Sequence, residues 1–370
     1  MKEVCLINYT GSKGGGAQYT FELTAALIEK GIPTVAVIAS HNENLKAWKA
    51  LKLEKLVIIN TYTTPKELIL NSLNWRKVGK QIRAELKDFS VTNIISPMIT
   101  FWTKRINQLF PKANSIVVLH DAIAHSGDKN KKIIQLFGET DVLKKADYVV
   151  VLSKIYTDLV QDKYHKTKNQ VVQIPLGTTN LYKNIADKIQ TPTYDPSLVN
   201  FLFFGTISHY KGIGVLSEAY REVVRHANNV SLTIAGSGDF SKYAGAFEGL
   251  SNVTVYNKWI LDEEIESFFN DDSVVAVLPY LDASQSGVIP LAVSYGVPVI
   301  ATETGGIVEQ LTTYETGLMV PPNDANALAQ QMLAFANDPQ ILVEQKKLAL
   351  ENKDKFAWTE IAEKFTKLLK

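Results

Sequence analysis

The stretch PYLDASQSGVIPLAVSYGVPVIATETGGIVEQL, Pro279–Leu311, is almost uncharged and rich in residues typical of turns. No charge occurs from Ala283 to Thr302, a length that nominally spans a bilayer. Glycines, prolines and polar side chains interrupt this run, which favours buried structure in a soluble domain. The runs VVAVLPY and VPVIAT are short, apolar and β-branched, as strands of a parallel sheet are.

The same pattern extends in both directions along the chain. Earlier runs are EVCLINY, TVAVIAS, LVIIN, VTNIIS, SIVVLH and DYVVVLS, and later ones include VNFLFFG, SLTIAGS, NVTVYN and GLMVPP. Amphipathic segments separate them, so we predict an α/β fold with two Rossmann-like, doubly wound parallel sheets. The chain of 370 residues suits two domains, which we place at 1–180 and 199–355, with a polar linker at 181–198 and a final helix at 356–370.

The formal charge of +1 conceals an asymmetry between the two halves. Residues 1–190 hold 27 Lys and Arg against 16 Asp and Glu, and the rest hold 12 against 22. The segments PKELILNSLNWRKVGKQIRAELKDF and ITFWTKRINQLFPK are both basic and aromatic. Two interpretations stay open: docking on an anionic lipid surface, or core helices with solvated lysines. The basic half lacks a nucleic-acid reader motif, so no nucleic-acid partner is expected.

The beginning of the chain, MKEVCLINYT, runs directly into a strand pattern and lacks the features of a signal peptide. The lone cysteine, Cys5, requires no oxidising compartment. We therefore expect a cytoplasmic protein, which becomes peripheral on the inner face of the cell membrane if the basic half docks on lipid.

Two loops in the first half carry candidate ligand-binding residues. Gly14, Gly15 and Gly16 follow the first strand and open a helix, where backbone and helix terminus favour an anion. The spacing is not that of a Walker A loop, which argues against nucleoside triphosphate hydrolysis. The loop VVLHDAIAHSGD places titratable groups after a strand, suited to acid–base or sugar-hydroxyl contacts: His120, Asp121 and His125. These groups could also suggest a metal, but the rest of the loop does not complete a typical ligand set, so we predict no metal site.

The second half repeats glycine loops after strands. Lys211 stands just before a helix, where its ammonium suits a diphosphate. The remaining candidates for donor binding are Gly205 and Thr206, Gly236, Ser237 and Gly238, Ser284, Gln285, Ser286, Gly287 and Val288, and Glu309. Several such loops in one domain predict a nucleotide-diphosphate site.

In their order along nearly the whole chain, these motifs resemble the retaining GT-B glycosyltransferases of group 1, the family 4-like transferases. The matching segments include VLHD, IPLG, FFGTISHYKGI, IAGSGD, GVPVIATETGGIVEQL and TGLMVPPNDANALAQQM. The resemblance implies a metal-independent, hexosyltransferase-type enzyme without a cofactor. Its C-terminal domain would bind a nucleotide-diphosphate sugar and its N-terminal domain a glycan or lipid-linked acceptor. The final helix would cross back to the first domain.

The resemblance also assigns roles. Lys211 would hold the diphosphate, and His120 would lie near the transferred sugar. These two are the predicted catalytic residues. Gly15 and Gly16 would approach the diphosphate, and Glu309 matches the glutamate after the paired glycines. The backbone of Ser286–Val288 would cradle the donor, while Asp121 and His125 lie on the acceptor side.

Three positions depart from the family pattern. Thr206 stands where an arginine is common, and Ser284 and Ala292 replace two glutamates that contact donor sugar and ribose. Two functions follow: an active transferase for surface polysaccharide or glycolipid, or a catalytically silent GT-B subunit that stabilises a partner transferase. A GT-B sugar-nucleotide epimerase is disfavoured, because it needs acid–base carboxylates at these positions.

Overall fold

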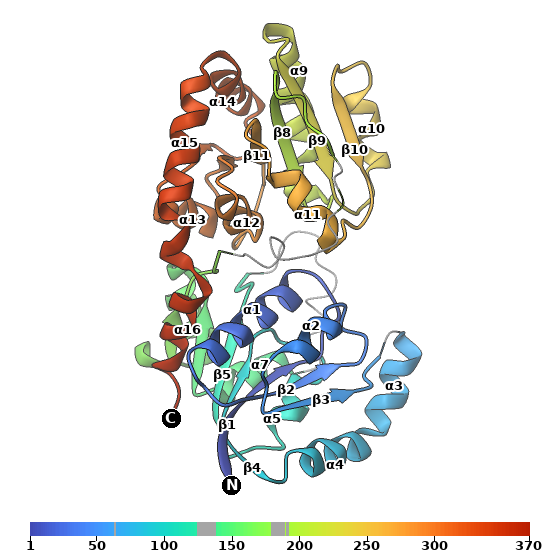
Figure 1. Ribbon diagram of the computed structural model, residues 1–370, viewed down its shortest axis with the longest axis vertical. Helices are drawn as coiled ribbons and strands as arrows, with labels where there is room; N and C mark the ends of the chain where they lie inside the picture. Colours follow the sequence, from blue (N-terminus) through green and yellow to red (C-terminus); the bar gives the residue numbers. More distant parts are fainter. Residues whose placement is uncertain (63, 124–137, 179–188, 190–191) are drawn as a thin grey trace. The chain divides into compact units, whose positions relative to one another are not determined.

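The computed structural model describes residues 1–62, 64–123, 138–178, 189 and 192–370 (Figure 1). They form two compact units. Unit 1 comprises Met1–Ala122, the described part of Asp128–Leu176, and Trp358–Lys370. Unit 2 comprises the described part of Gly177–Ala357 together with Ile123.

Unit 1, over its described residues, has a seven-stranded sheet in the order β3-β2-β1-β4-β5-β6-β7, with all neighbours parallel. The strands are β1 (Lys2–Tyr9), β2 (Thr34–Ala39), β3 (Lys55–Ile59), β4 (Phe89–Ser96), β5 (Asn114–Leu119), β6 (Tyr148–Val151) and β7 (Val171–Gln173). The α-helices are α1 (Gly15–Glu29), α2 (Leu45–Ala50), α3 (Pro65–Leu73), α4 (Trp75–Glu85), α5 (Thr103–Asn107), α7 (Glu139–Lys145), α8 (Thr157–Tyr164) and α16 (Trp358–Thr366), with 3-10 turns η1 (Lys154–Tyr156) and η2 (Lys168–Gln170).

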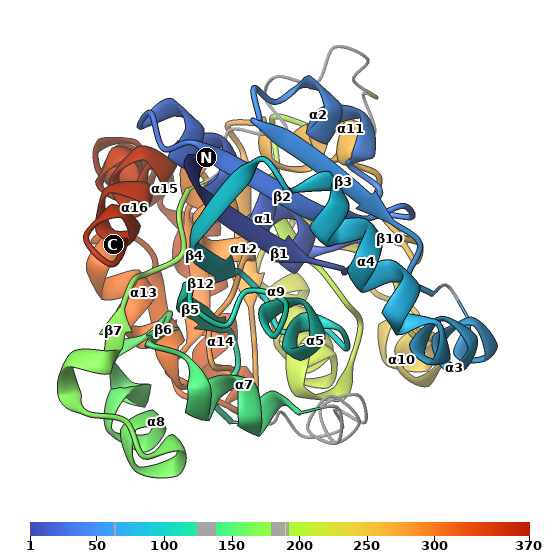
Figure 2. The same cartoon turned by 90° about the horizontal axis from the view of Figure 1, so that it is seen from below.

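Helices cover both faces of this sheet. Figure 2 shows α4 and α5 in front of the strands, and α1 behind them. Ile82 of α4, Leu86 just after that helix and Ile106 of α5 join the core of β1–β4. All six residues of β2 are buried, as expected for a strand covered on both faces.

Unit 2 has a six-stranded parallel sheet among the residues described, in the order β10-β9-β8-β11-β12-β13. The strands are β8 (Val199–Phe204), β9 (Val230–Ala235), β10 (Val253–Tyr256), β11 (Val274–Leu278), β12 (Val299–Thr302) and β13 (Leu318–Val320). The α-helices are α9 (Ile213–His226), α10 (Ser241–Phe247), α11 (Asp262–Phe269), α12 (Val288–Ser294), α13 (Gly306–Tyr314), α14 (Ala325–Asn337) and α15 (Pro339–Asn352), with 3-10 turns η4 (His209–Lys211) and η5 (Lys353–Phe356).

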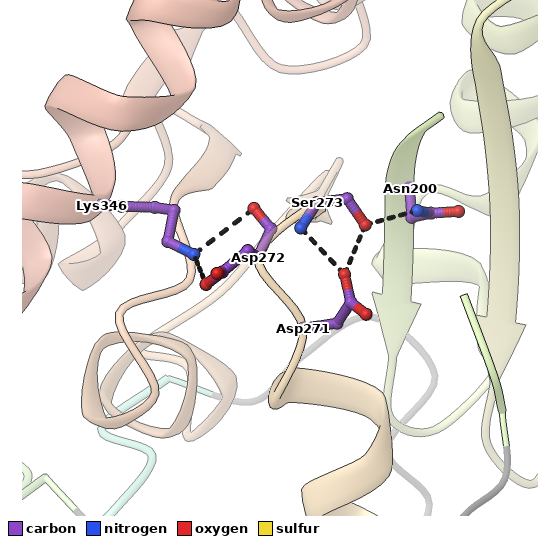
Figure 3. Close-up of polar contacts among 5 residues, drawn as sticks. All are labelled: Asn200, Asp271, Asp272, Ser273 and Lys346. Carbon is purple, nitrogen blue, oxygen red and sulfur yellow. Dashed lines mark hydrogen bonds and ion pairs between the residues drawn. The ribbon is translucent and has the colours of Figure 1, made fainter. Parts of the chain in front are cut away.

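A polar network ties β8 to β11 at the amino ends of these strands (Figure 3). Asn200 Nδ2 donates to Ser273 Oγ at 2.6 Å, and the Ser273 amide donates to Asp271 Oδ1 at 2.9 Å. Lys346 of α15 pairs with Asp272 beside it. Because Asn200 is buried, these bonds replace those it would make to water. The network aligns the two central strands from the edge opposite their carboxyl ends.

The prediction of two α/β domains with parallel sheets is confirmed. The strand β7 was not predicted. The uncharged run after Ala283 forms α12 and β12, both largely buried. In the described part of the chain, no helix has the length and hydropathy needed to cross a membrane.

The last helix, α16, packs against α1 within unit 1. The Trp358 ring meets Tyr19 edge to face at 5.0 Å between centroids, and Lys30 Nζ lies 3.2 Å from Glu363 Oε2. After the helix, the Leu368 carbonyl accepts a hydrogen bond of 2.8 Å from the buried Asn114 side chain. In the predicted linker 181–198, two residues bond to α11: the Ile189 amide donates to the Glu263 carbonyl, and Tyr194 Oη donates to the Phe268 carbonyl.

Candidate functional site

The predicted donor-binding residues of unit 2 follow four neighbouring strands. They come after β8 (Gly205, Thr206, Lys211), β9 (Gly236, Ser237, Gly238), β11 (Ser284, Gln285, Ser286, Gly287, Val288) and β12 (Glu309). The strands are parallel and adjacent, so these loops share the carboxyl edge of one sheet. Ligands bind at this edge in open α/β sheets.

The loops after β8 and β9 lie directly against each other. The Gly205 amide donates to the Ala235 carbonyl at 2.9 Å, and the Ile207 amide donates to the Ser237 carbonyl at 2.8 Å. A Cβ on Gly236, where φ is 152°, would lie 1.8 Å from the Gly205 carbonyl oxygen. Gly236 is therefore required for close backbone packing inside the site.

Lys211 ends the turn η4, and aromatic rings hold its ammonium. Its Nζ lies 3.6 Å from the centroid of the Tyr280 ring and 5.0 Å from that of Tyr210. Tyr280 is fully buried, and burial raises the pKa of its phenol to about 12. The ring stays neutral at physiological pH and attracts the cation through its π-face. Sequence analysis did not identify Tyr280, which lies 69 positions from Lys211 along the chain.

Tyr280 also contacts the loop that leads to α12. Its hydroxyl lies 3.3 Å from Ser286 Oγ, which accepts a bond of 3.2 Å from the Val288 amide. The side chain of Gln310 on α13 holds the main chain of Ser286 at both ends, with N–H to Oε1 at 2.8 Å and Nε2 to C=O at 3.1 Å. Of the three amides predicted to cradle the donor, those of Ser286 and Val288 thus donate within the chain. Gly287 itself is exposed.

Gln310 was not singled out from the sequence, although it follows Glu309 directly. Replacement by leucine would leave the amide and carbonyl of Ser286 without this partner. We expect Gln310→Leu to lower the free energy of unfolding by roughly 1–3 kcal/mol and to weaken nucleotide binding. Urea unfolding and nucleotide-induced thermal shift measure the two effects.

Gln310→Glu is the matched variant, because it keeps an acceptor for the Ser286 amide. Its stability should lie between that of wild type and Gln310→Leu. If Gln310→Leu had the stability and the nucleotide binding of the wild type, the contacts of Gln310 with Ser286 would be dispensable.

Of the three positions that depart from the family pattern, the two where glutamates are replaced are both buried. Ser284 is 2% exposed, and Ala292 on α12 is fully buried. A carboxylate at position 292 would need a buried partner for its charge, whereas alanine needs none. Thr206 is exposed, and Glu309 is half-buried in the first turn of α13.

The glycine loop of unit 1 begins α1, with Gly14 as its N-cap at φ 82°. The Gly14 amide donates to Glu43 Oε1 at 2.9 Å, and the Glu43 amide donates to the Ser12 carbonyl at 2.9 Å. A carboxylate of the chain itself thus lies at the helix N-terminus where the sequence predicts the donor's diphosphate. Gly16 packs against Met98, since a Cβ there would lie 2.1 Å from the Met98 sulfur.

His120 follows β5, and two contacts of its imidazole ring fix the position of the side chain. The Nε2–H group donates to the Pro97 carbonyl at 2.8 Å, and the ring meets Tyr19 at 4.8 Å between centroids. Burial lowers the pKa of His120 and outweighs the opposing effects of Pro97 and Asp121. The neutral ring carries its acceptor on Nδ1, as an acid–base or sugar-contacting role requires. His125 lies outside the described residues.

The two predicted catalytic residues, His120 and Lys211, belong to different units. Over the residues described, no cluster of three or more His, Cys, Asp or Glu side chains could hold a metal ion. At the carboxyl edge of the sheet in unit 2, the predicted donor loops carry a lysine cation, hydroxyl groups and glycines.

Comparisons with known proteins agree with this arrangement. Residues 199–338 match the family model described as glycosyl transferases group 1. Over 342 residues the chain is 21% identical to an uncharacterised glycosyltransferase of Haemophilus influenzae, covering 90% of each chain. It is 23% identical to the O-antigen chain mannosyltransferase C of Escherichia coli, covering 90% of this chain and 87% of the relative.

Among solved structures, the chain resembles a sucrose-phosphate synthase of Thermosynechococcus elongatus, with a TM-score of 0.72, 20% identity, and coverage of 100% of this chain and 98% of the other. It also resembles HepE of Anabaena, solved with UDP-glucose, with a TM-score of 0.70, 15% identity and 99% coverage of both chains. The fold is therefore GT-B. Together, the fold and the family match support a group 1 glycosyltransferase.

Proposed function

We propose that this protein is a group 1 glycosyltransferase that moves a hexose from a nucleotide-diphosphate sugar to a glycan or lipid-linked acceptor, with retention, in surface polysaccharide or glycolipid synthesis. The observation that carries the proposal is the Lys211 ammonium over Tyr280, at the sheet edge shared by the donor loops. The relative named for the O-antigen chain supports the polysaccharide context.

The chemistry needs a group that stabilises charge on the departing diphosphate. As the bond from the anomeric carbon to the phosphate oxygen breaks, negative charge grows on that oxygen. A fixed cation in a partly buried site lowers the free energy of this transition state. Lys211 supplies that charge in our proposal, and we therefore expect turnover to continue in EDTA. The role of the second predicted catalytic residue, His120, stays a prediction of the family resemblance.

The donor is identified by a thermal-shift and donor-hydrolysis screen with UDP-, GDP-, TDP- and ADP-sugars. UDP-glucose is the first candidate, because HepE was solved with it. We expect stabilisation by one nucleotide class and slow release of its sugar. If no nucleotide shifts the melting temperature, the transferase proposal fails, and a silent GT-B subunit becomes the better explanation.

Peripheral attachment to an anionic membrane is the second part of the proposal. On α4, Ile82 is buried in the core of unit 1, and the half-buried side chains of Trp75 and Val78 pack against that core. The basic side chains of α4 are exposed, and so are Leu70 and Leu73 at the end of α3. The candidate membrane surface is therefore the α3 leucines with the α4 cations.

The test is Lys77→Glu/Lys80→Glu/Arg83→Glu in flotation with phosphatidylglycerol vesicles. Each basic residue near an anionic surface contributes about 1 kcal/mol, so binding should weaken at least about a hundredfold. Nucleotide binding should not change. Lys242→Glu/Lys347→Glu, at exposed positions of unit 2, is the control. Equal flotation of wild type and the triple variant would show that α3 and α4 are ordinary core helices with solvated lysines.

A further inference from the structure

Three half-buried rings form a row at the carboxyl edge of the sheet in unit 1. His41 follows β2, Tyr62 follows β3 and Phe101 lies beyond β4. Tyr62 meets Phe101 at 5.3 Å between centroids and His41 at 6.3 Å. We call these three residues the aromatic row.

The strand order gives the aromatic row its position. In the sheet, β3 and β4 are separated by β2 and β1, so the contact between Tyr62 and Phe101 passes across the ends of both. From β1 the chain continues to β2 on one side of β1, and it later returns to form β4 on the other side of β1. This is the topological switch point, where ligands bind in open α/β sheets.

Polar side chains that form hydrogen bonds with one another lie at the same edge of the sheet as the aromatic row. Thr10, directly after β1, is buried, and its Oγ1 lies 2.6 Å from Thr100 Oγ1. The His41 Nδ1 atom lies 3.3 Å from Thr61 Oγ1. With the threonine hydroxyl donating to Nδ1, the neutral imidazole carries its proton on Nε2 as a donor. Burial lowers the pKa of His41, although Glu67 opposes this, which favours the neutral ring.

Two carboxylates act on groups at this edge of the sheet. Glu43 acts on Tyr9 at the end of β1, and Glu67 acts on His41. Two carboxylates disfavour a phosphate or other anion here. Flat apolar faces with a few neutral hydrogen-bonding groups suit a ligand that has both an apolar face and hydroxyl groups. A pyranose has this chemistry, because its axial C–H bonds form an apolar face and its hydroxyls project from the rim.

We propose that the aromatic row binds an uncharged pyranose ring of the acceptor glycan, with Tyr62 and Phe101 stacking on the sugar and His41 bonding a hydroxyl. This rests on the proposed function, which it deepens by naming the acceptor class and the residues that select it. A lipid diphosphate is not held here: the aromatic row recognises sugar.

The test is saturation-transfer NMR of the whole chain with methyl glycosides of glucose, galactose, mannose and N-acetylglucosamine. At least one should bind wild-type protein. Tyr62→Leu and Phe101→Leu keep an apolar side chain but remove the flat ring, and each should weaken that binding at least tenfold. Tyr62→Phe keeps the ring and should bind like wild type. The control Tyr148→Leu changes a half-buried aromatic at the opposite, amino edge of the same sheet.

Failure of this proposal is distinct from failure of the proposed function. If no glycoside binds, or if both leucine variants bind like wild type, the aromatic row is not a sugar subsite. Equal weakening in Tyr148→Leu would also overturn it, since the loss would then be general. Nucleotide-induced thermal shifts report the donor site separately and should be unchanged in all four variants.

Discussion

Lys211→Ala should lower donor-dependent turnover by two to three orders of magnitude. Removal of one fixed group that stabilises transition-state charge typically costs about 10²–10³ in rate. Lys211 is half-buried, with its ammonium 3.6 Å from the Tyr280 ring centroid, so it is held before the donor arrives. The measurement is sugar release or transfer from the donor identified by the nucleotide screen.

Two companion variants sharpen this test. Lys211→Arg keeps the positive charge but not the compact ammonium, and should retain part of the activity. Lys347→Ala removes an exposed lysine from α15 and should leave turnover unchanged. The melting temperature of Lys211→Ala should fall only slightly, because one cation–π contact contributes about 0.5–2 kcal/mol. Turnover within threefold of wild type in Lys211→Ala would exclude Lys211 as the group that stabilises the leaving diphosphate.

Gly212→Ala should destabilise unit 2 by at least about 3 kcal/mol, because left-handed backbone and steric overlap act together. Gly212 has φ 71°, and a Cβ there would lie 1.8 Å from the Pro279 carbonyl oxygen. Neither atom belongs to a flexible side chain, so the backbone on one side has to move. That movement would displace Lys211 and Tyr280 together, and activity should be lost along with stability.

Gly214→Ala is the matched control, two positions away. Gly214 lies inside α9, and a Cβ there would meet nothing within 4 Å. Alanine is the better helix former, so this variant should gain about 0.5–1 kcal/mol. Thermal unfolding should show Gly212→Ala melting roughly 6–12 °C below wild type and Gly214→Ala slightly above it. Equal melting temperatures for the two variants would contradict the geometry at Gly212.

The predicted elements and the observed ones agree where hydrophobic patterning is strong. Runs such as TVAVIAS became β2, which is buried at every position, and the predicted final helix at 356–370 became α16. The strand β7 was missed, because three residues are too few to show a period. Its formation depends on pairing with β6, which pattern alone does not reveal.

The candidate site shows a similar division. The positions of Lys211 and the glycine loops after strands followed from local sequence, and the roles assigned to them remain predictions. The contacts that hold these residues did not follow. Glu43 reaches Gly14 across 29 positions, and Gln310 reaches Ser286 across 24. The aromatic row likewise joins three separate loops.

By itself the sequence therefore determined the class of fold, two parallel α/β sheets, and the loops that carry the candidate donor site. Hydrophobic periodicity, glycines and helix starts are local properties, and each can be read within about a dozen residues. The side chains that meet at one edge of a sheet follow from the tertiary fold: the Tyr280 ring beside Lys211, the Glu43 carboxylate at α1 and the aromatic row of unit 1. These contacts arise when parallel strands bring the ends of distant segments to one edge of a sheet, and no local pattern encodes which partner arrives there.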